Sequence, residues 1–145
     1  MFRKTLLALV ASFCLPATAA LAQQFSLPGK WYCTVNARSN APEGNYGVEA
    51  EIQVSPNGSL RGRGNVIFPQ LQRSIQPFSG GGDWTVLPPE PGQSELVKFR
   101  VHTNTHGIVV WFARPVGPGQ MYNRFTPPPQ NGRTIDVETQ CGKTG

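Results

Sequence analysis

The sequence predicts an all-β fold: a single antiparallel, up-and-down β-barrel of about eight strands, with its first and last strands tied by a disulfide. Beyond residue 22, no stretch keeps apolar residues at the i, i+3, i+4, i+7 spacing of an amphipathic helix. Gly or Pro interrupts the chain about every eight to twelve residues, and apolar and polar residues alternate between the interruptions. Two cysteines stand near opposite ends of this region, so we expect the chain ends to meet.

Residues 1–22 have the pattern of a secretory signal peptide. Arg3 and Lys4 give a positive start, residues 5–15 form an apolar run, and Ala20-Leu21-Ala22 is a small-residue cleavage site. The run is shorter than the roughly 18 to 20 residues of a membrane span, so we expect no membrane insertion. Removing this segment takes two of the 13 Lys and Arg and leaves a domain of residues 23–145 with net charge +3. That charge does not support nucleic-acid binding.

The cysteines predict an oxidising compartment, periplasmic or secreted. Cys14 lies in the signal segment, which leaves Cys33 and Cys141 as an even pair. A disulfide between them closes a loop of about 108 residues, worth on the order of 4 to 5 kcal/mol in the chain-entropy model. Two buried free thiols are the alternative. A lipid anchor on Cys14 is disfavoured by bulky Phe13 before it.

The clearest element is a hairpin over residues 48–68. Apolar residues alternate with polar ones over residues 48–54, Ser55-Pro56-Asn57-Gly58 supplies the turn, and residues 59–68 form the return strand. A three-residue loop at 56–58 places Ile52 opposite Gly62 and Glu51 opposite Arg63.

Further strands are predicted at residues 29–36, 84–87, 96–102, 108–114, 120–126 and 134–141. A disulfide between the first and last strands of an up-and-down meander requires an even number of strands. Residues 71–78, with Pro69 and Pro77 beside or inside them, are therefore interpreted as a loop or a broken edge strand. Residues 79–83 are interpreted as a loop, and a sandwich with paired terminal strands is the competing architecture.

The run Gly29-Lys30-Trp31-Tyr32 enters the first strand, and Asn57-Gly58-Ser59-Leu60 follows at a second hairpin. This start resembles the Gly-x-Trp start of the calycin barrels, which include lipocalins and avidins. The resemblance implies that Trp31 plugs one end of the barrel and that a basic residue near the last strand, for which Arg133 is the candidate, packs against it. The mid-chain lipocalin motif and the avidin ligand pattern are not found, so no ligand is carried over. Trp31 as an ordinary core aromatic is the alternative.

The favoured function is non-enzymatic: carrying or sensing a small apolar ligand in the barrel interior. Eight strands leave an interior that side chains fill or that surrounds one small ligand, and glycines on the inward face are expected to leave space. The predicted ligand-binding residues are Trp31, Gly62, Gly64, Phe99, Val101 and Trp111. A completely filled interior is the alternative.

The second hypothesis is a protein-binding module, such as an inhibitor of an exported protease or other hydrolase. Residues 108–113 are apolar on both faces of their strand, so we expect the outer face to be covered by residues 87–92, a dimer partner or a client protein. Residues 23–28 could act as an inserted inhibitory segment. A homo-oligomer is left open.

Catalysis is the third hypothesis, and no catalytic residue is assigned. Glu49 and Glu51 alternate with apolar residues on a solvent-facing side, and no activated nucleophile is recognisable. His102 and His106 flank a turn but lack nearby further ligands in sequence, so neither a metal nor another cofactor is expected. An enzyme would depend on one of these histidines.

Overall fold

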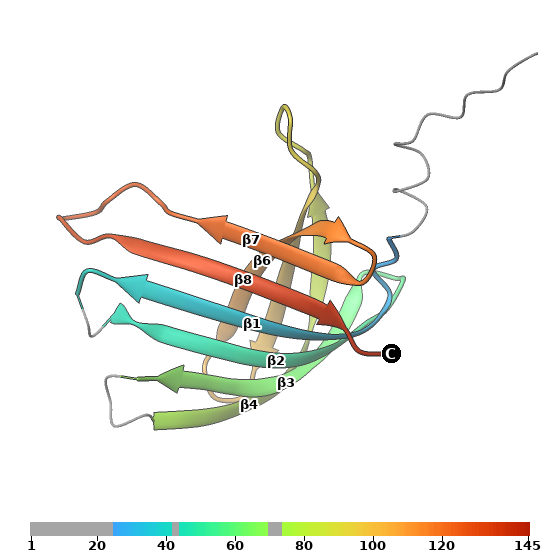
Figure 1. Cartoon of the computed structure of the whole chain (residues 1–145). Helices are drawn as coiled ribbons and strands as arrows, with labels where there is room; N and C mark the ends of the chain where they lie inside the picture. Colours follow the sequence, from blue (N-terminus) through green and yellow to red (C-terminus); the bar gives the residue numbers. More distant parts are fainter. Residues whose placement is uncertain (1–24, 42–43, 70–73) are drawn as a thin grey trace, which may run out of the picture.

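A computed structural model describes residues 25–41, 44–69 and 74–145, which form a closed antiparallel barrel (Figure 1). Its strands are β1 (Gly29–Ser39), β2 (Tyr46–Val54), β3 (Ser59–Phe68), β4 (Ser74–Leu87), β5 (Leu96–Thr103), β6 (Ile108–Gly117), β7 (Gln120–Phe125) and β8 (Ile135–Lys143). Each strand pairs with the next along the chain, and β8 returns to pair with β1. The predicted all-β, up-and-down, eight-stranded barrel is confirmed. The predicted signal peptide lies outside the described residues, among which no helix is long and apolar enough to cross a membrane.

The pairing of β1 with β8 closes the barrel. Cys33 stands directly opposite Cys141 in the register, their Cα atoms are 4.1 Å apart, and their sulfur atoms are bonded. The predicted disulfide between the first and last strands is confirmed, and the alternatives of free thiols and of a sandwich are wrong. A disulfide indicates an oxidising environment outside the cytoplasm.

The β2–β3 hairpin has the predicted register. Ile52 pairs with Gly62 and Glu51 pairs with Arg63, whose guanidinium Nη2 donates to a Glu51 carboxylate oxygen at 2.8 Å. Gly58 in the turn has a φ of +88°, a conformation that glycine adopts without strain. The local sequence pattern was therefore sufficient to define this element.

The fourth strand differs from the prediction. Residues 79–83 were expected to be a loop, and residues 71–78 a loop or a broken edge strand. Instead, residues 74–83 continue into the predicted strand 84–87 and form with it one 14-residue strand. Residues 71–73 lie outside the described residues. The reason is a close approach of β5: a Cβ on Gly80 or Gly82 would overlap the carbonyl oxygen of His102 or Arg100. These glycines permit tight strand packing and do not mark a turn.

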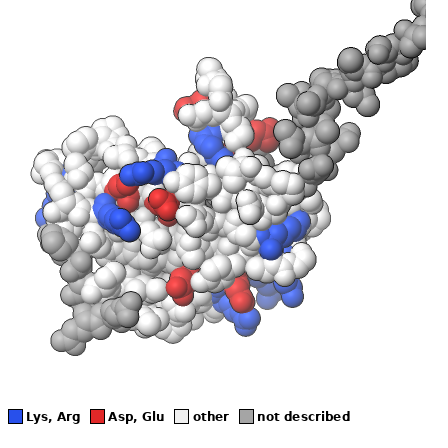
Figure 2. Space-filling model, viewed as in Figure 1, with Lys and Arg blue, Asp and Glu red and all other residues white. Residues whose placement is uncertain are grey.

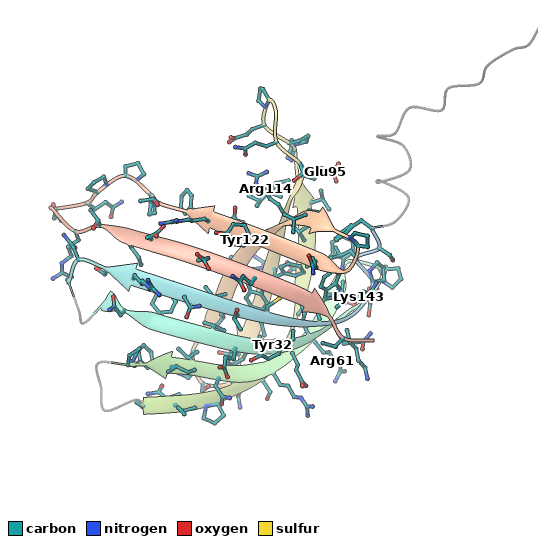
Figure 3. The ribbon with its side chains drawn as sticks, viewed as in Figure 1. Tyr32, Arg61, Glu95, Arg114, Tyr122 and Lys143 are labelled. Carbon is teal, nitrogen blue, oxygen red and sulfur yellow. A yellow bond between two sulfur atoms is a disulfide. The ribbon has the colours of Figure 1, made fainter. Side chains whose placement is uncertain are left out.

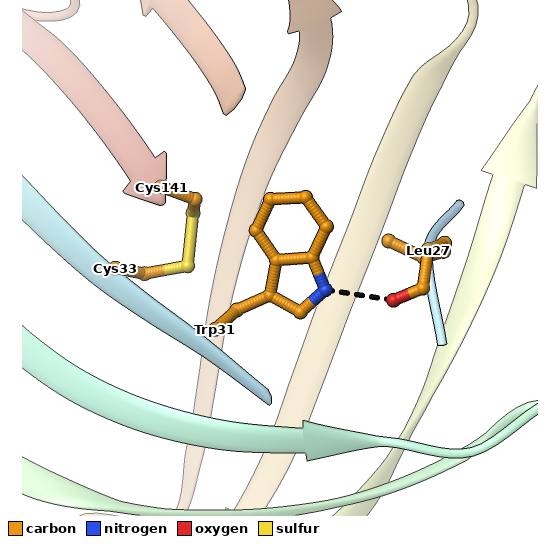
Figure 4. Close-up of a disulfide and its surroundings, with 4 residues drawn as sticks. All are labelled: Leu27, Trp31, Cys33 and Cys141. Carbon is orange, nitrogen blue, oxygen red and sulfur yellow. Dashed lines mark hydrogen bonds between the residues drawn. A yellow bond between two sulfur atoms is a disulfide. The ribbon is translucent and has the colours of Figure 1, made fainter. Parts of the chain in front are cut away.

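Trp31 plugs one end of the barrel, which we call the closed end (Figure 4). Its indole Nε1 donates to the Leu27 carbonyl oxygen at 2.7 Å, and the Phe25 ring lies 5.9 Å from its ring. Residues 25–28 therefore pack against the closed end of the barrel. Residues 23 and 24 of the candidate inhibitory segment 23–28 lie outside the described residues, and its inhibitory role stays a prediction.

The basic residue that packs on Trp31 is Lys143, and the prediction for Arg133 is wrong. Lys143 Nζ lies 5.6 Å from the Trp31 ring centroid and donates to the Ser26 carbonyl oxygen at 2.8 Å. Figure 3 labels Lys143 near the end of β8. Because β8 runs antiparallel to β1, the end of β8 pairs with the start of β1, where Trp31 stands. Arg133 precedes β8 and lies toward the opposite end, which we call the open end.

Candidate ligand site

The open half of the barrel contains a cavity of about 450 Å³. Its most buried lining residues are Val35, Val48, Val66, Trp111 and Thr139. Partly buried lining residues stand nearer the open end, and they include Tyr46, Phe68, Val109, Asn123 and Val137. This volume is in the range of small-molecule sites, which span roughly 300 to 1,000 Å³ and are mostly apolar.

The cavity is open through the barrel wall between β6 and β7. These strands pair only where Arg114, Pro115 and Gly117 of β6 meet the first three residues of β7, and the register shifts between Pro115 and Gly117. Over residues 108–113, β6 is paired with β5 on one side and has no paired residue of a described strand on the other. Outer-face residues of β6, such as Val110 and Phe112, therefore line the cavity together with inward Trp111.

The outer face of β6 remains exposed to solvent. Ile108 and Val110 are 53% and 41% exposed, and Phe125 across the opening is 56% exposed. We expected this face to be covered, by residues 87–92 among other options. Cover of Ile108 and Val110 by residues 87–92 is therefore wrong, whereas cover by a dimer partner or a client protein stays a prediction. The loop between β4 and β5 begins and ends at the paired residues Leu87 and Leu96. This pair lies past the end of the β5–β6 pairing, so the loop does not cover the apolar residues of β6.

One polar side chain at the cavity has hydrogen-bond partners and another has none among the described residues. His106, in the β5–β6 connection, lies 2.6 Å from Gln76 Oε1 through its Nε2 and 2.8 Å from Thr105 Oγ1 through its Nδ1. Trp111 is 2% exposed, and its Nε1 has no hydrogen-bond partner among the described residues. The Trp111 donor is therefore enclosed by neighbouring atoms without an acceptor among the described residues.

Of the six predicted ligand-binding residues, only Trp111 lines this cavity. Trp31, Phe99 and Val101 are completely buried in the core cluster, with the Phe99 ring stacked 5.7 Å from the Trp111 ring. The direct role of the other five in ligand binding stays a prediction.

The space expected at the two inward glycines is occupied. A Cβ on Gly62 would lie 3.2 Å from Val101 Cγ2 and 3.3 Å from Ile52 Cγ2, and one on Gly64 would overlap the carbonyl oxygen of Glu49. Neighbouring residues therefore fill the space of the missing side chains, and neither glycine lines the 450 Å³ cavity.

Sequence reasoning missed Asn123 and Thr139, which are paired in the β7–β8 register, while Thr139 is also opposite Val35. Their inward position follows from the two-residue alternation that places Met121 and Cys141 inside. That signal was present in the sequence once the last two strands were aligned.

A second, more open groove is formed by residues of β1, β2, β3 and β4. Charged side chains such as Arg61 and Arg63 line it together with glycines 80–82, and two of the predicted ligand-binding residues, Trp31 and Gly62, belong to its lining. Arg63 and Glu51 are 78% and 60% exposed, so the groove does not enclose a ligand. On the face seen in Figure 2, basic and acidic side chains are interspersed.

The two histidines of the enzyme hypothesis lie in different surroundings. His102 is exposed on the outside of β5, while His106 is half-buried at the cavity. In the described parts of the chain, no three His, Cys, Asp or Glu residues are grouped so that they could hold a metal ion.

No protein-family model matches the chain, and no curated protein is significantly similar to it. The closed eight-stranded barrel is consistent with the calycin resemblance, while membership of the lipocalins or avidins stays a prediction.

Proposed function

We propose that this chain is an exported, non-enzymatic binding protein that carries or senses a small apolar molecule in the open half of its barrel. The observation that supports it is the 450 Å³ cavity, bounded by valines and aromatic rings next to a well-packed closed half. Burying an apolar ligand there would gain roughly 25 cal/mol per Å² of apolar surface removed from water.

A periplasmic or secreted location is part of this proposal. The Cys33–Cys141 disulfide supports an oxidising compartment, and the predicted signal of residues 1–22 supports export.

Native mass spectrometry of the protein purified from its own periplasm or medium tests the proposal. We expect a small adduct that survives native conditions and leaves on denaturation, and its mass would indicate the ligand class. As a second measurement, the fluorescent apolar probe N-phenyl-1-naphthylamine should bind with one-to-one stoichiometry. An absence of both adduct and probe binding would contradict carriage.

The second candidate is a protein-binding module such as an inhibitor of an exported hydrolase, and the unpaired edge of β6 favours it. Ile108 and Val110 are exposed beside that edge, and an exposed apolar edge can pair with an extended segment of another protein.

Two matched substitutions separate the candidates. Val110→Lys adds a charge beside the β6 edge, whereas Ile75→Lys adds one on β4 at a residue that is 61% exposed. If a protein-sized partner is present in the native mass spectrum, Val110→Lys should remove it and Ile75→Lys should not. A partner mass equal to the chain's own would indicate a homo-oligomer.

A further inference from the structure

The sixth strand has a free edge beside the cavity. Over residues 108–113, β6 pairs with β5 on one side and with no described strand on the other. Residues of this edge and of β7, such as Val110 and Asn123, line the same cavity, so the space between the two strands is continuous with the barrel interior. A free strand edge presents N–H and C=O groups to which an added strand can bond.

The hydrogen bonds around β5 define which backbone groups of this edge are free. The Asn104 N–H donates to the Ser79 carbonyl oxygen at 3.2 Å, and the Thr103 N–H donates to the Gly107 carbonyl oxygen at 2.7 Å. Bonded and non-bonded pairs alternate along an antiparallel ladder. The even-numbered residues of β5 therefore bond to β4, and its odd-numbered residues bond to β6.

Three residues of β6 consequently have their backbone groups at the free edge. Their partners in the β5–β6 register are residues 98, 100 and 102, whose own N–H and C=O groups face β4. The residues whose N–H and C=O groups point away from β5 are Ile108, Val110 and Phe112.

A strand added at this edge would place every second side chain in the cavity. Directly opposed residues of an antiparallel pair share a face of the sheet, so the residues opposite Val109 and Trp111 would point inward. Among the described lining residues of the cavity there is no Lys, Arg, Asp or Glu. Uncharged, apolar side chains match this lining, since a charge would lose its hydration without gaining a counter-charge.

We propose that the free edge of β6 binds an extended segment of a partner protein as an added antiparallel strand. The segment bonds through its backbone to the three edge residues, and its two side chains opposite Val109 and Trp111 are apolar and enter the cavity. This inference rests on the second candidate function, a protein-binding module, and adds the chemistry of the partner.

A peptide tests the proposal on the exported, disulfide-bonded protein. The peptide is acetylated, amidated and of sequence Lys-Thr-Ile-Thr-Ile-Thr-Lys, with the isoleucines meant for the cavity and the lysines for solubility. Because the isoleucines occupy the cavity, the peptide should displace the apolar probe N-phenyl-1-naphthylamine, with a dissociation constant below about 1 mM.

Two N-methylated forms of the peptide are the matched controls. Methylation of the threonine nitrogens removes the N–H groups that face β6, and methylation of the isoleucine nitrogens removes those that face away from it. The first form should not displace the probe, because each lost hydrogen bond weakens binding roughly 3- to 10-fold and the methyl groups block the edge. The second form should still displace it. Equal behaviour of the two forms would contradict pairing with the edge.

Val110→Pro changes the edge from the side of the protein. Proline removes the Val110 N–H, which points away from β5, so the β5–β6 ladder keeps its hydrogen bonds. The variant should weaken peptide binding at least about 10-fold, whereas Val110→Thr keeps the N–H and should weaken it less than about threefold. Equal losses would show that the Val110 side chain binds the peptide and its backbone does not.

Amide hydrogen exchange tests the edge in the wild-type protein, in case Val110→Pro does not fold. The N–H groups of Val110 and Phe112 should exchange faster than those of Val109 and Trp111, which face β5. The peptide should slow the exchange of the first pair. Equal protection of the two pairs in the free protein would overturn the proposal.

The outcomes separate this inference from the proposed functions. Probe binding with neither displacement nor amide protection by the peptide would overturn the added strand and leave the carrier function standing. A protein partner that Val110→Lys removes, but that leaves the Val110 and Phe112 amides unprotected, would overturn the added strand and leave the protein-binding module. A dimer of the chain that Val110→Pro dissociates, without peptide binding, would overturn it in favour of a second copy.

Discussion

The closed and open halves of the barrel are built from the same eight strands, yet they are packed differently. In the closed half, Trp31 and its register partner Ile52 are almost completely buried, and the indole of Trp31 is hydrogen-bonded. In the open half, Trp111 is equally buried but lines a cavity and has an unpartnered N–H. One half is a filled core and the other has space for a ligand.

The difference indicates that the cavity arises where two neighbouring strands of the wall separate, and not where inward side chains are small. Gly62 and Gly64 face occupied space, whereas the cavity is lined by valines and aromatic residues. The wall separates where β6 and β7 stop pairing, beyond the irregularity at Pro115. Because proline has no N–H to donate to the ladder, it favours such a break.

Removal of the disulfide should have the largest effect, and it acts on the whole barrel. In the double variant Cys33→Ala/Cys141→Ala, the denatured chain regains the entropy of an open loop of 108 residues. We expect the free energy of unfolding, measured in urea, to fall by about 4 kcal/mol. A loss under about 1 kcal/mol would contradict this entropic role. Where the variant remains folded, its affinity for the apolar probe should be unchanged.

Adding bulk should separate the two halves most clearly. Gly62→Val would force extra methyl groups against Val101 and Ile52, and such overpacking costs about 2 kcal/mol. Val66→Phe, on the same strand, would extend into the cavity and should change stability by less than about 1 kcal/mol. Urea unfolding and probe titration measure both effects. Val66→Phe should abolish probe binding, and unimpaired binding would show that the probe lies elsewhere.

Removing bulk gives a smaller contrast with matched residue types. Val101→Ala deletes contacts in the filled core, at a residue that does not line the cavity, and should cost about 2 kcal/mol because it leaves a new void. Val48→Ala should cost about 1 kcal/mol, since its side chain already adjoins a cavity and makes fewer contacts there. Equal losses in urea unfolding would indicate that the open half is filled in solution.

Acid should produce the smallest effect, through two ion pairs on opposite sides of the opening. A hydrogen bond from Arg100 lowers the pKa of Asp83 on the β4–β5 side, and hydrogen bonds from Arg124 and then Thr126 lower the pKa of Asp136 on the β7–β8 side. Each folded pKa lies below the unfolded value of 3.8. The stabilisation is therefore present above that value and is lost as the pH falls through the folded pKa.

Asp83→Asn and Asp136→Asn should each reduce the drop in the urea midpoint between pH 7 and pH 3. The effect should shrink at high salt, because both pairs are exposed and screened. If Asp136→Asn reduces the drop more than Asp83→Asn does, the Arg124–Asp136 pair contributes more to stability than the Arg100–Asp83 pair. An unchanged acid sensitivity in both variants would contradict the contribution of these pairs.

The β2–β3 hairpin and the closure of the barrel by β1 and β8 could be predicted from the sequence. The first depends on a local residue pattern, and the second on the positions of two cysteines and the number of strands between them. Alternation around Ile52 and the turn at Gly58 define one register, and two cysteines joined across an even number of strands define the other. The long fourth strand was not predictable in the same way, because three consecutive glycines favour a loop unless a neighbouring strand approaches as closely as β5 does.

The candidate site was predicted only in part. Trp111 was identified from its apolar strand, whereas Asn123 and Thr139 required the β7–β8 register, and the exposure of Val110 required knowledge of where β6 loses its partner. The choice of Lys143 over Arg133 depended on which end of β8 reaches Trp31.

By itself, the sequence determined the strand alternation, the even number of strands and the pairing of Cys33 with Cys141, because these depend on side-chain period, turn chemistry and chain parity. Only the tertiary structure decided which half is filled, where the wall opens and which tryptophan lacks a partner. Those properties depend on how closely particular strands approach one another, and that distance is set jointly by all the packed neighbours around the barrel.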